Sequence, residues 1–272
     1  MHRPEDRPAH PTIEQIREVC QPPEIRGRKN SEHWTGDVFT RSLSPYLTRA
    51  FVRAGLSANA VTVGMILCGW AAAAALLIPG WWGPLLAAVL AMGQMLLDAS
   101  DGEVARWTRK MGPRGIFLDR IAHTTTESLV PMAAGFRIAL EADPIDWRWA
   151  FAGTLLGMLV LWNKSLNDGS RLARVQGGMP LAKEDTGIKV PTVGWVARAR
   201  RAANLVPIHR AYHSVEQTLV MLALATVGLV AGFNGVAVAV VILLVAAPFV
   251  IAGHTLAILT SSQLKVPATP ES

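Results

Sequence analysis

The sequence predicts an all-α integral membrane protein with six transmembrane helices, preceded by an N-terminal interfacial amphipathic helix. The chain of 272 residues is 51% hydrophobic and only 17% charged, with a mean hydropathy of +0.30. Its apolar segments reach about 20 residues, which is the length that an α-helix needs to cross ~30 Å of hydrocarbon. A soluble domain of this size carries more charge and shorter apolar segments.

The N-terminal part of the chain has two sections of different character. Residues 1–35 are polar and rich in proline and charge, so we expect a largely disordered tail with a short helix near 13–19. In residues 36–54, apolar side chains recur at helical spacing and are flanked by arginines. This pattern is typical of an amphipathic helix in the membrane interface, although a soluble helix packed on a partner has the same pattern.

Six apolar segments follow, and with the interfacial helix they form a membrane domain expected over residues 36–262. Residues 263–272 are expected to be a C-terminal tail. The predicted transmembrane segments are 57–79, 82–107, 115–138, 148–170, 213–232 and 234–261.

Lysine and arginine are distributed unevenly along the chain. Nine of them precede residue 57, and others gather after the second segment and in the long connection 171–212. Connections with many basic residues stay on the cytoplasmic side of a membrane, so we expect both termini there. The net charge of +6 therefore reflects topology, and no nucleic-acid partner is expected. A multi-pass protein of the plasma (inner) membrane is the predicted location.

Acidic residues inside two of these segments are the main candidates for a functional site. Asp98 and Asp101 share one helix face at the end of the second segment, and Asp119 shares a face with His123 at the start of the third. The short connection 108–114 predicts that the two helices are antiparallel neighbours with these faces at one depth, near the cytoplasm. Clustered carboxylates in apolar helices are costly unless they pair or bind a cation, and they suit Mg²⁺, Mn²⁺ or Ca²⁺.

Two alternatives need no ligand. Pairing of the acids with Arg106 and Arg120 would neutralise them, but three acids on two facing stripes exceed what helix packing needs. The small residues Gly102 and Ala105 either let a ligand approach the backbone or serve close helix packing.

The spacing of these residues resembles a known family. Asp98-x2-Asp101-Gly102-x2-Ala105-Arg106-x8-Gly115-x3-Asp119-x3-His123 is similar to the pattern D-x2-D-G-x2-A-R-x8-G-x3-D-x3-D of the CDP-alcohol phosphotransferases. Each fixed position matches except the last, where His123 replaces aspartate. The six segments and the amphipathic N-terminal helix also resemble the family, so the likeness covers residues 35–262.

This resemblance implies a reaction and a set of site residues. Family members transfer a substituted phosphoryl group from a CDP-linked donor, often CDP-diacylglycerol, to an alcohol and release CMP. It implies a homodimer, and a divalent metal, Mg²⁺ or Mn²⁺ and often two ions, bound by Asp98, Asp101 and Asp119. The nucleotide-binding residues that it implies are Asn59, Thr62, Gly102, Ala105 and Arg106, although Asn59 and Thr62 also suit a helix cap.

The replacement at His123 leaves three interpretations open. The family's last aspartate is its proposed general base, and a histidine with an unperturbed pKa of ~6.5 can take a proton at neutral pH. His123 is alternatively a metal ligand, which would shift the preference towards Mn²⁺ or Zn²⁺. In the third interpretation the base is lost, and the protein is weakly active or uses an acceptor that is already ionised.

Basic residues after the fourth segment suggest the acceptor. The run Lys164-x3-Asp168-Gly169 resembles family members that use phosphorylated polyols, and Arg171 follows it. Arg200 and Arg201 could bind an acceptor phosphate, or equally attract anionic lipid headgroups. We therefore expect a polyol or polyol phosphate as acceptor.

Two other functions compete with a membrane transferase. Acids in transmembrane helices also mark ion-coupled transporters, but here they lie at one end of the segments and no broken helix occurs near mid-membrane. A catalytically weakened family member that binds metal and nucleotide is the other alternative, motivated by His123. The histidines His209, His213 and His254 are interpreted as loop or packing residues.

Overall fold

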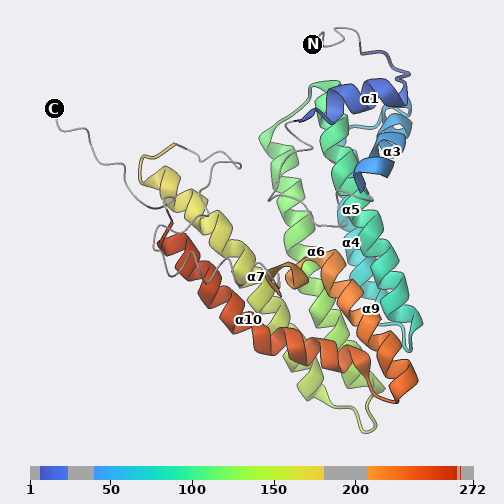
Figure 1. The fold of residues 1–272 in the computed structure, drawn as a ribbon, viewed down its shortest axis with the longest axis vertical. Coiled ribbons are helices and arrows are strands. Elements are labelled where there is room, and N and C mark those ends of the chain that lie inside the picture. Colours follow the sequence, from blue (N-terminus) through green and yellow to red (C-terminus); the bar gives the residue numbers. More distant parts are fainter. Residues whose placement is uncertain (1–6, 24–39, 181–207, 262–263, 265–272) are drawn as a thin grey trace, which may run out of the picture.

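The computed structural model describes residues 7–23, 40–180, 208–261 and 264, and this part of the chain contains helices and no strand. Figure 1 shows the helices as an elongated bundle. In chain order they are α1 (Ile13–Cys20), α3 (Arg41–Arg53), α4 (Ala58–Ala75), α5 (Trp82–Thr108), α6 (Pro113–Glu141), α7 (Trp147–Gln176), the short 3₁₀ helix η2 (Ile208–Tyr212), α9 (Ser214–Ala231) and α10 (Gly235–Leu259).

Each of the six predicted segments coincides with one long helix. Four of these helices, α4, α5, α9 and α10, are long and apolar enough to cross a membrane, judged by length and composition. The other two, α6 and α7, are the longest at 29 and 30 residues, but they carry more charged side chains. The all-helical class and a membrane-protein composition are thus confirmed, while the full set of six spans remains a proposal.

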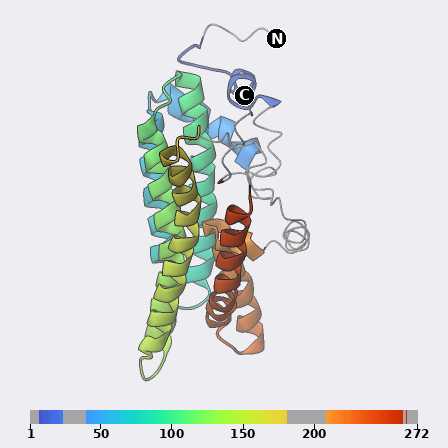
Figure 2. The same ribbon diagram turned by 90° about the vertical axis from the view of Figure 1, so that its left-hand side faces the viewer.

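The six long helices alternate in direction. The connections 76–81, 142–146 and 232–234 lie at one end of the bundle, and the turn between α5 and α6 lies at the other (Figure 1). Helices α9 and α10 lie together beside the layer formed by α4–α7 (Figure 2), where α9 contacts α5 and α10 contacts α7.

The expected pairing of α5 with α6 is confirmed for the side chains, since Gln94 Nε2 of α5 donates to Thr126 Oγ1 of α6 (3.2 Å), but the two backbones do not pack closely. Helix α4 packs against both of them, whereas α5 and α6 make few backbone contacts with each other. Their short connection starts at Arg109, which takes the left-handed conformation (φ 57°) and ends α5. A tight turn brings only the ends of two helices together, and the rest of each helix packs where its small residues allow.

Helices α6 and α7 approach closely because glycines face each other. A Cβ built on Gly153 would lie 2.6 Å from the Cα of Gly135, and a Cβ on Gly157 would lie 2.6 Å from the carbonyl oxygen of Ser128. Small residues let helix backbones touch and gain dispersion contacts, as is typical of helices packed in membranes. This contact fixes α6 against α7 and therefore fixes the polar side chains that the two helices carry.

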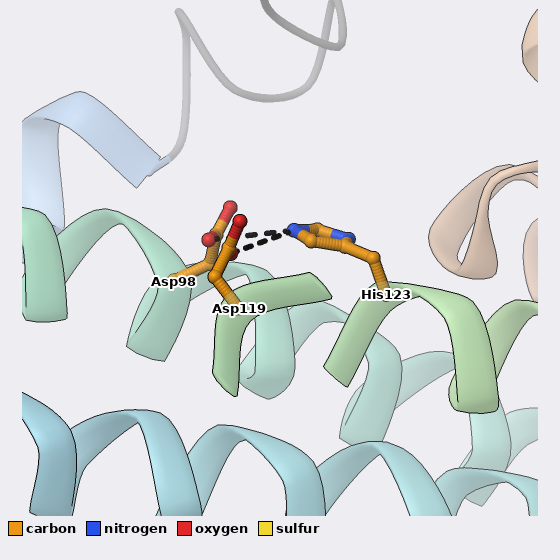
Figure 3. A group of neighbouring side chains, drawn as sticks. All are labelled: Asp98, Asp119 and His123. Carbon is orange, nitrogen blue, oxygen red and sulfur yellow. Dashed lines mark ion pairs between the residues drawn. The ribbon is translucent and has the colours of Figure 1, made fainter. Parts of the chain in front are cut away.

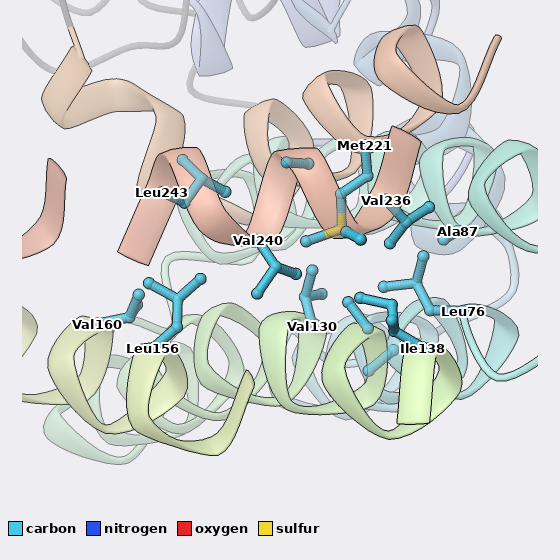
Figure 4. Close-up of a cluster of buried hydrophobic side chains, with 14 of the residues drawn as sticks. Leu76, Ala87, Val130, Ile138, Leu156, Val160, Met221, Val236, Val240 and Leu243 are labelled. Atoms are coloured by element: carbon cyan, nitrogen blue, oxygen red, sulfur yellow. The ribbon is translucent and has the colours of Figure 1, made fainter. Parts of the chain in front are cut away.

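The interior and the outer surface of the bundle are both apolar. Figure 4 shows the interior, where side chains such as Val130, Leu156, Met221 and Val240 from α6, α7, α9 and α10 meet. On the outside, Phe151 and Phe249 are 70% and 77% exposed. Large exposed apolar surfaces are unfavourable in water, so this surface suits a lipid environment.

The buried carboxylate of Glu103 holds α1 and α3 on α5. Its Oε1 accepts hydrogen bonds from Gln21 Nε2 (2.8 Å) and Ser44 Oγ (2.7 Å), and its Oε2 accepts one from Thr48 Oγ1 (2.6 Å). Helix α1 forms where the short helix near 13–19 was expected, but its packing was not predicted. Helix α3 covers the described part of the expected helix 36–54, and residues 36–39 lie outside the described ranges.

Replacing Gly153 with alanine should destabilise the protein by about 1–3 kcal/mol, because the new methyl group would overlap the backbone of α6. Gly64→Ala in α4 is the matched control, since a Cβ there meets nothing within 4 Å. The free energy of unfolding of both variants is measured by titration with a denaturing detergent. Equal stability of the two variants would mean that α6 and α7 are not in contact.

Cys20 should resist alkylation in the folded protein. It is fully buried between α1 and α5, and burial raises the pKa of its thiol to about 12, so only about one molecule in 10⁴ is a reactive thiolate at pH 8. In a Cys68→Ala background, N-ethylmaleimide should label Cys20 in SDS but not in mild detergent. Rapid labelling in mild detergent would show that α1 is not docked.

Candidate functional site

The carboxylates of Asp98 and Asp119 and the ring of His123 form one cluster. One ligand atom from each lies within 4.8 Å of the other two. His123 Nε2 is 3.5 Å from Asp98 Oδ1 and 3.4 Å from Asp119 Oδ1, and Figure 3 shows the ring pointing at both carboxylates. Helix α5 supplies Asp98, and α6 supplies Asp119 and His123 one turn apart. The convergence that the spacing predicted is therefore present, although the backbones of α5 and α6 are not closely packed.

The cluster is accessible to a ligand. The side chains of Asp98, Asp119 and His123 are 35%, 40% and 29% exposed. Side chains that only stabilise a helical bundle are normally buried against a partner. Partial exposure instead leaves room for a metal ion or a substrate to reach the donor atoms.

Asp101 belongs to the same face of α5 but lies outside this three-residue cluster. Its Oδ2 accepts a 2.6 Å hydrogen bond from the Thr62 hydroxyl, whose oxygen also lies 3.0 Å from the carbonyl oxygen of Ala58 one turn earlier in α4. Thr62 was expected to contact a nucleotide. In the structure Thr62 instead orients the Asp101 side chain, so α4 contributes to the geometry of the site through this hydrogen bond.

The other residues expected at a nucleotide lie around the same ends of α4, α5 and α6. Asn59 Oδ1 would lie 3.4 Å from a Cβ on Gly115, so the Asn59 side chain faces the start of α6. The guanidinium of Arg106 covers Gly102, with Nη1 3.1 Å from the position of a Cβ, and Arg106 Nε donates to the carbonyl oxygen of Cys20. Ala105 is partly buried. The space beside Gly102 is thus occupied by Arg106 in this conformation.

Glu127 is a buried acid that the sequence pattern did not single out. It lies next to the cluster, on the side of the His123 ring away from Asp98 and Asp119. Only 1% of its side chain is exposed. Its Oε1 is 3.7 Å from His123 Nδ1 and 3.3 Å from His213 Nδ1, and its Oε2 is 2.8 Å from Lys164 Nζ. The cost of an acid in an apolar helix could have identified Glu127, because it follows His123 by four residues on one face. His213 was interpreted as a packing residue, but it contacts this carboxylate.

The residues expected at the acceptor are only partly described. Lys164 forms the ion pair with Glu127, while its side chain remains 24% exposed. Arg171 is partly buried on α7, and Arg200 and Arg201 lie outside the described residues. Arg120, considered as a counter-ion for the motif acids, pairs with Asp168 of α7 at 3.1 Å.

The donor set of the cluster fits a divalent cation. Ligand atoms that share an ion at ~2.1 Å lie about 3–4 Å apart, and the separations of 3.4 and 3.5 Å from His123 Nε2 agree with this. Two carboxylates suit Mg²⁺ or Mn²⁺, and an imidazole adds affinity for Mn²⁺ or Zn²⁺. Asp101 is one turn from Asp98 on α5, and in this conformation its carboxylate accepts the hydrogen bond from Thr62.

No protein-family model matches this chain, and no curated protein matches it. The chemistry and geometry of the residues therefore carry the functional proposal.

The double variant Asp98→Asn/Asp119→Asn should bind Mn²⁺ at least tenfold more weakly, because it removes two anionic ligands. The free Mn²⁺ signal in electron paramagnetic resonance measures this binding in detergent. Asp143→Asn, in the connection at the opposite end of the bundle, is the control and should bind as the unmodified protein does. Equal affinity of all three proteins would exclude a metal site in the cluster.

Proposed function

We propose that this protein is a metal-dependent membrane transferase of the CDP-alcohol phosphotransferase type. It would move a phosphatidyl or other substituted phosphoryl group from a CDP-linked lipid, such as CDP-diacylglycerol, to a polyol or polyol phosphate in phospholipid biosynthesis. The observation that carries the proposal is the convergence of Asp98, Asp119 and His123 from two helices within 4.8 Å, at the spacing of the family pattern.

The site residues have distinct roles in this reaction. Asp98, Asp101 and Asp119 would hold the divalent ions, Mg²⁺ or Mn²⁺. Bound ions supply positive charge that neutralises the pyrophosphate of the donor, and phosphoryl transfer depends mainly on such neutralisation and on in-line positioning. His123 Nε2 would accept the proton of the acceptor hydroxyl. The acceptor oxygen then forms a bond to the lipid-linked phosphorus, the bond from that phosphorus to the CMP oxygen breaks, and CMP leaves.

The arrangement of His123 supports its role as the base. Its side chain is 29% exposed beside Asp98 and Asp119, so Nε2 is open to an acceptor hydroxyl, and in this role His123 would not itself bind the ions. Replacing aspartate with histidine at this position thus retains a group that can bind a proton. The alternative of a lost base is favoured only by the departure from the family pattern, and turnover decides between the two.

We infer a topology of six spans with both termini and the site on the cytoplasmic side of the inner membrane. The basic turn 109–114 and the site lie towards one end of the bundle, and connections with few basic residues lie at the other. The polar residues Ser44 and Thr48 of α3 are buried, while Leu43 and Tyr46 are 40% and 56% exposed. An outward apolar side suits a helix in the membrane interface.

The acceptor and the oligomeric state follow from the same inference. Lys164 and Arg171 on α7, with Arg200 and Arg201 in the following connection, would attract the phosphate of a polyol phosphate. Membrane lipids would surround the exposed apolar faces, and a second copy of the chain would complete a homodimer.

CMP release by the purified protein tests the proposal directly. With CDP-diacylglycerol, Mg²⁺ or Mn²⁺, and a panel of polyols and polyol phosphates, we expect metal-dependent CMP release with one acceptor class. Asp98→Asn and Asp101→Asn should each lower the rate about 10²–10³-fold, because each removes an anionic ligand of the ions that neutralise the negative charge of the transition state. Asp143→Asn should retain the rate of the unmodified protein.

Other outcomes would select the alternatives. Binding of Mn²⁺ and CDP without CMP release from any acceptor would indicate a weakened family member. Ion-driven uptake of a solute into vesicles, without CMP release, would indicate a carrier.

A further inference from the structure

A pocket lies beside the end of α5, where Figure 1 shows α1 and α3 next to that helix. Its volume of about 450 Å³ is in the range of sites for small molecules. Its walls come from three segments: the chain before α1, the last turn of α3, and the end of α5 with the connection that follows. Trp107, its first lining residue on α5, is ~9 Å beyond Asp101 at 1.5 Å per residue, so the pocket is separate from the carboxylate cluster.

The charged side chains of the pocket are all positive. Arg7, Arg109 and Lys110 line it, and no acid is among its lining residues in the part of the chain that the structure describes. Arg109 and Lys110 are exposed, and Arg7 is partly buried. Three like charges around one space repel each other, and an anion between them removes that repulsion.

Hydrogen bonds hold the N-terminal wall of the pocket at both of its ends. Arg7 Nη1 donates to the carbonyl oxygens of Arg106 (2.5 Å) and Trp107 (2.7 Å) at the end of α5. Arg53 Nε of α3 donates to His10 Nδ1 (3.4 Å). The wall is therefore attached to α5 and to α3, which gives the pocket a defined shape.

The three cations also suit structural roles, which explain only part of the arrangement. A cation near the last carbonyl groups of a helix stabilises it, and this accounts for Arg7 at the end of α5. A basic connection stays on the cytoplasmic side of a membrane, and this accounts for the charge of Arg109 and Lys110. Neither role requires the three side chains to surround one space of ligand size.

We propose that this pocket binds a phosphate monoester, with the phosphate group between Arg7, Arg109 and Lys110. Such a group carries a charge of about −1.5 to −2 at pH 7 and accepts strong hydrogen bonds from cations. The pocket also has an apolar wall, which accommodates the carbon part of the ester and is formed by Pro8, Ala9 and Val52.

Two sources carry this chemistry, the headgroup of a phosphatidate in the membrane and a soluble phosphate ester. The inference goes beyond the transferase function and does not depend on it, since none of the three cationic side chains has a role in the proposed reaction. Its test therefore measures binding and needs no turnover.

The affinity is measured on the purified full chain in detergent with EDTA, so that the carboxylate cluster holds no metal. The lipid probe is dioleoyl phosphatidate, with bound lipid counted by native mass spectrometry, and the soluble probe is glycerol 3-phosphate, measured by calorimetry. At least one probe should bind roughly tenfold more tightly than its counterpart without the monoester, phosphatidylcholine or glycerol. Binding of phosphatidate alone identifies a headgroup as the source, and binding of glycerol 3-phosphate identifies a soluble ester. No preference for either probe would overturn the proposal.

Single-charge variants test whether the probe occupies this pocket. Arg7→Gln and Lys110→Gln should each weaken its binding about tenfold, because each removes a charge-assisted hydrogen bond. Arg114→Gln is the matched control, since it removes an exposed charge near the same connection, but Arg114 does not line the pocket. Its affinity should change less than about twofold. An equal loss in Arg114→Gln and Lys110→Gln would overturn the proposal, because binding would then follow the general positive charge of this end.

The docking of the N-terminal segment is checked separately, because Arg7→Gln removes contacts that attach it to α5. Protection of Cys20 from N-ethylmaleimide, in the Cys68→Ala background, shows whether α1 stays docked in each variant. If Cys20 becomes reactive in Arg7→Gln, the exposed Lys110 decides the test, since its replacement removes no contact of α1. Unchanged affinity in Lys110→Gln with Cys20 protected would overturn the proposal.

Discussion

A charged side chain inside an apolar bundle must meet an opposite charge or a polar partner, because its removal from water costs several kcal/mol. Helices α6 and α7 carry more charge than the other long helices, and their charges meet across the contact between them: Glu127 with Lys164, and Arg120 with Asp168. The glycines that bring the two backbones together make these pairs possible. The pairs in turn fix the position of α6 along α7, and with it the position of the side chains that α6 presents to the site.

Some helices supply the side chains of the site, and others hold those helices in position. Helix α6 supplies two members of the cluster and packs against α7 and α9. Helix α5 supplies Asp98 and is held through α4, where Thr62 binds Asp101, and through α1 and α3. Because α4 packs on both α5 and α6, it sets the separation of the two halves of the cluster. The geometry of the cluster therefore depends on seven helices, five of which supply none of its three side chains.

The sequence was sufficient for the parts of this arrangement that depend on local spacing. Helical periodicity placed Asp98, Asp119 and His123 on the correct faces and located all six long helices. It failed where a partner is distant in the chain: Glu127 finds Lys164 and His213 37 and 86 residues away. A short turn was also insufficient to predict which helix backbones pack most closely, because it fixes the ends of two helices and not the sides that they present to other helices. The packing of α1 on α5 was not predicted, because it depends on the buried Glu103. Glu103 stands at a position that the motif leaves variable, so the spacing gave no reason to expect it to be buried.

The hydrogen bonds of Glu103 give the polar N-terminal region a structural role that its composition conceals. Gln21, Ser44 and Thr48 lie before the first long helix, yet they surround a buried acid only two residues from Asp101. A shortened protein that begins at residue 57 would leave the Glu103 carboxylate without these three hydrogen-bond donors. The loss would fall on the turn of α5 that also carries Asp101, so the part of the chain that keeps the cluster intact begins before the first long helix.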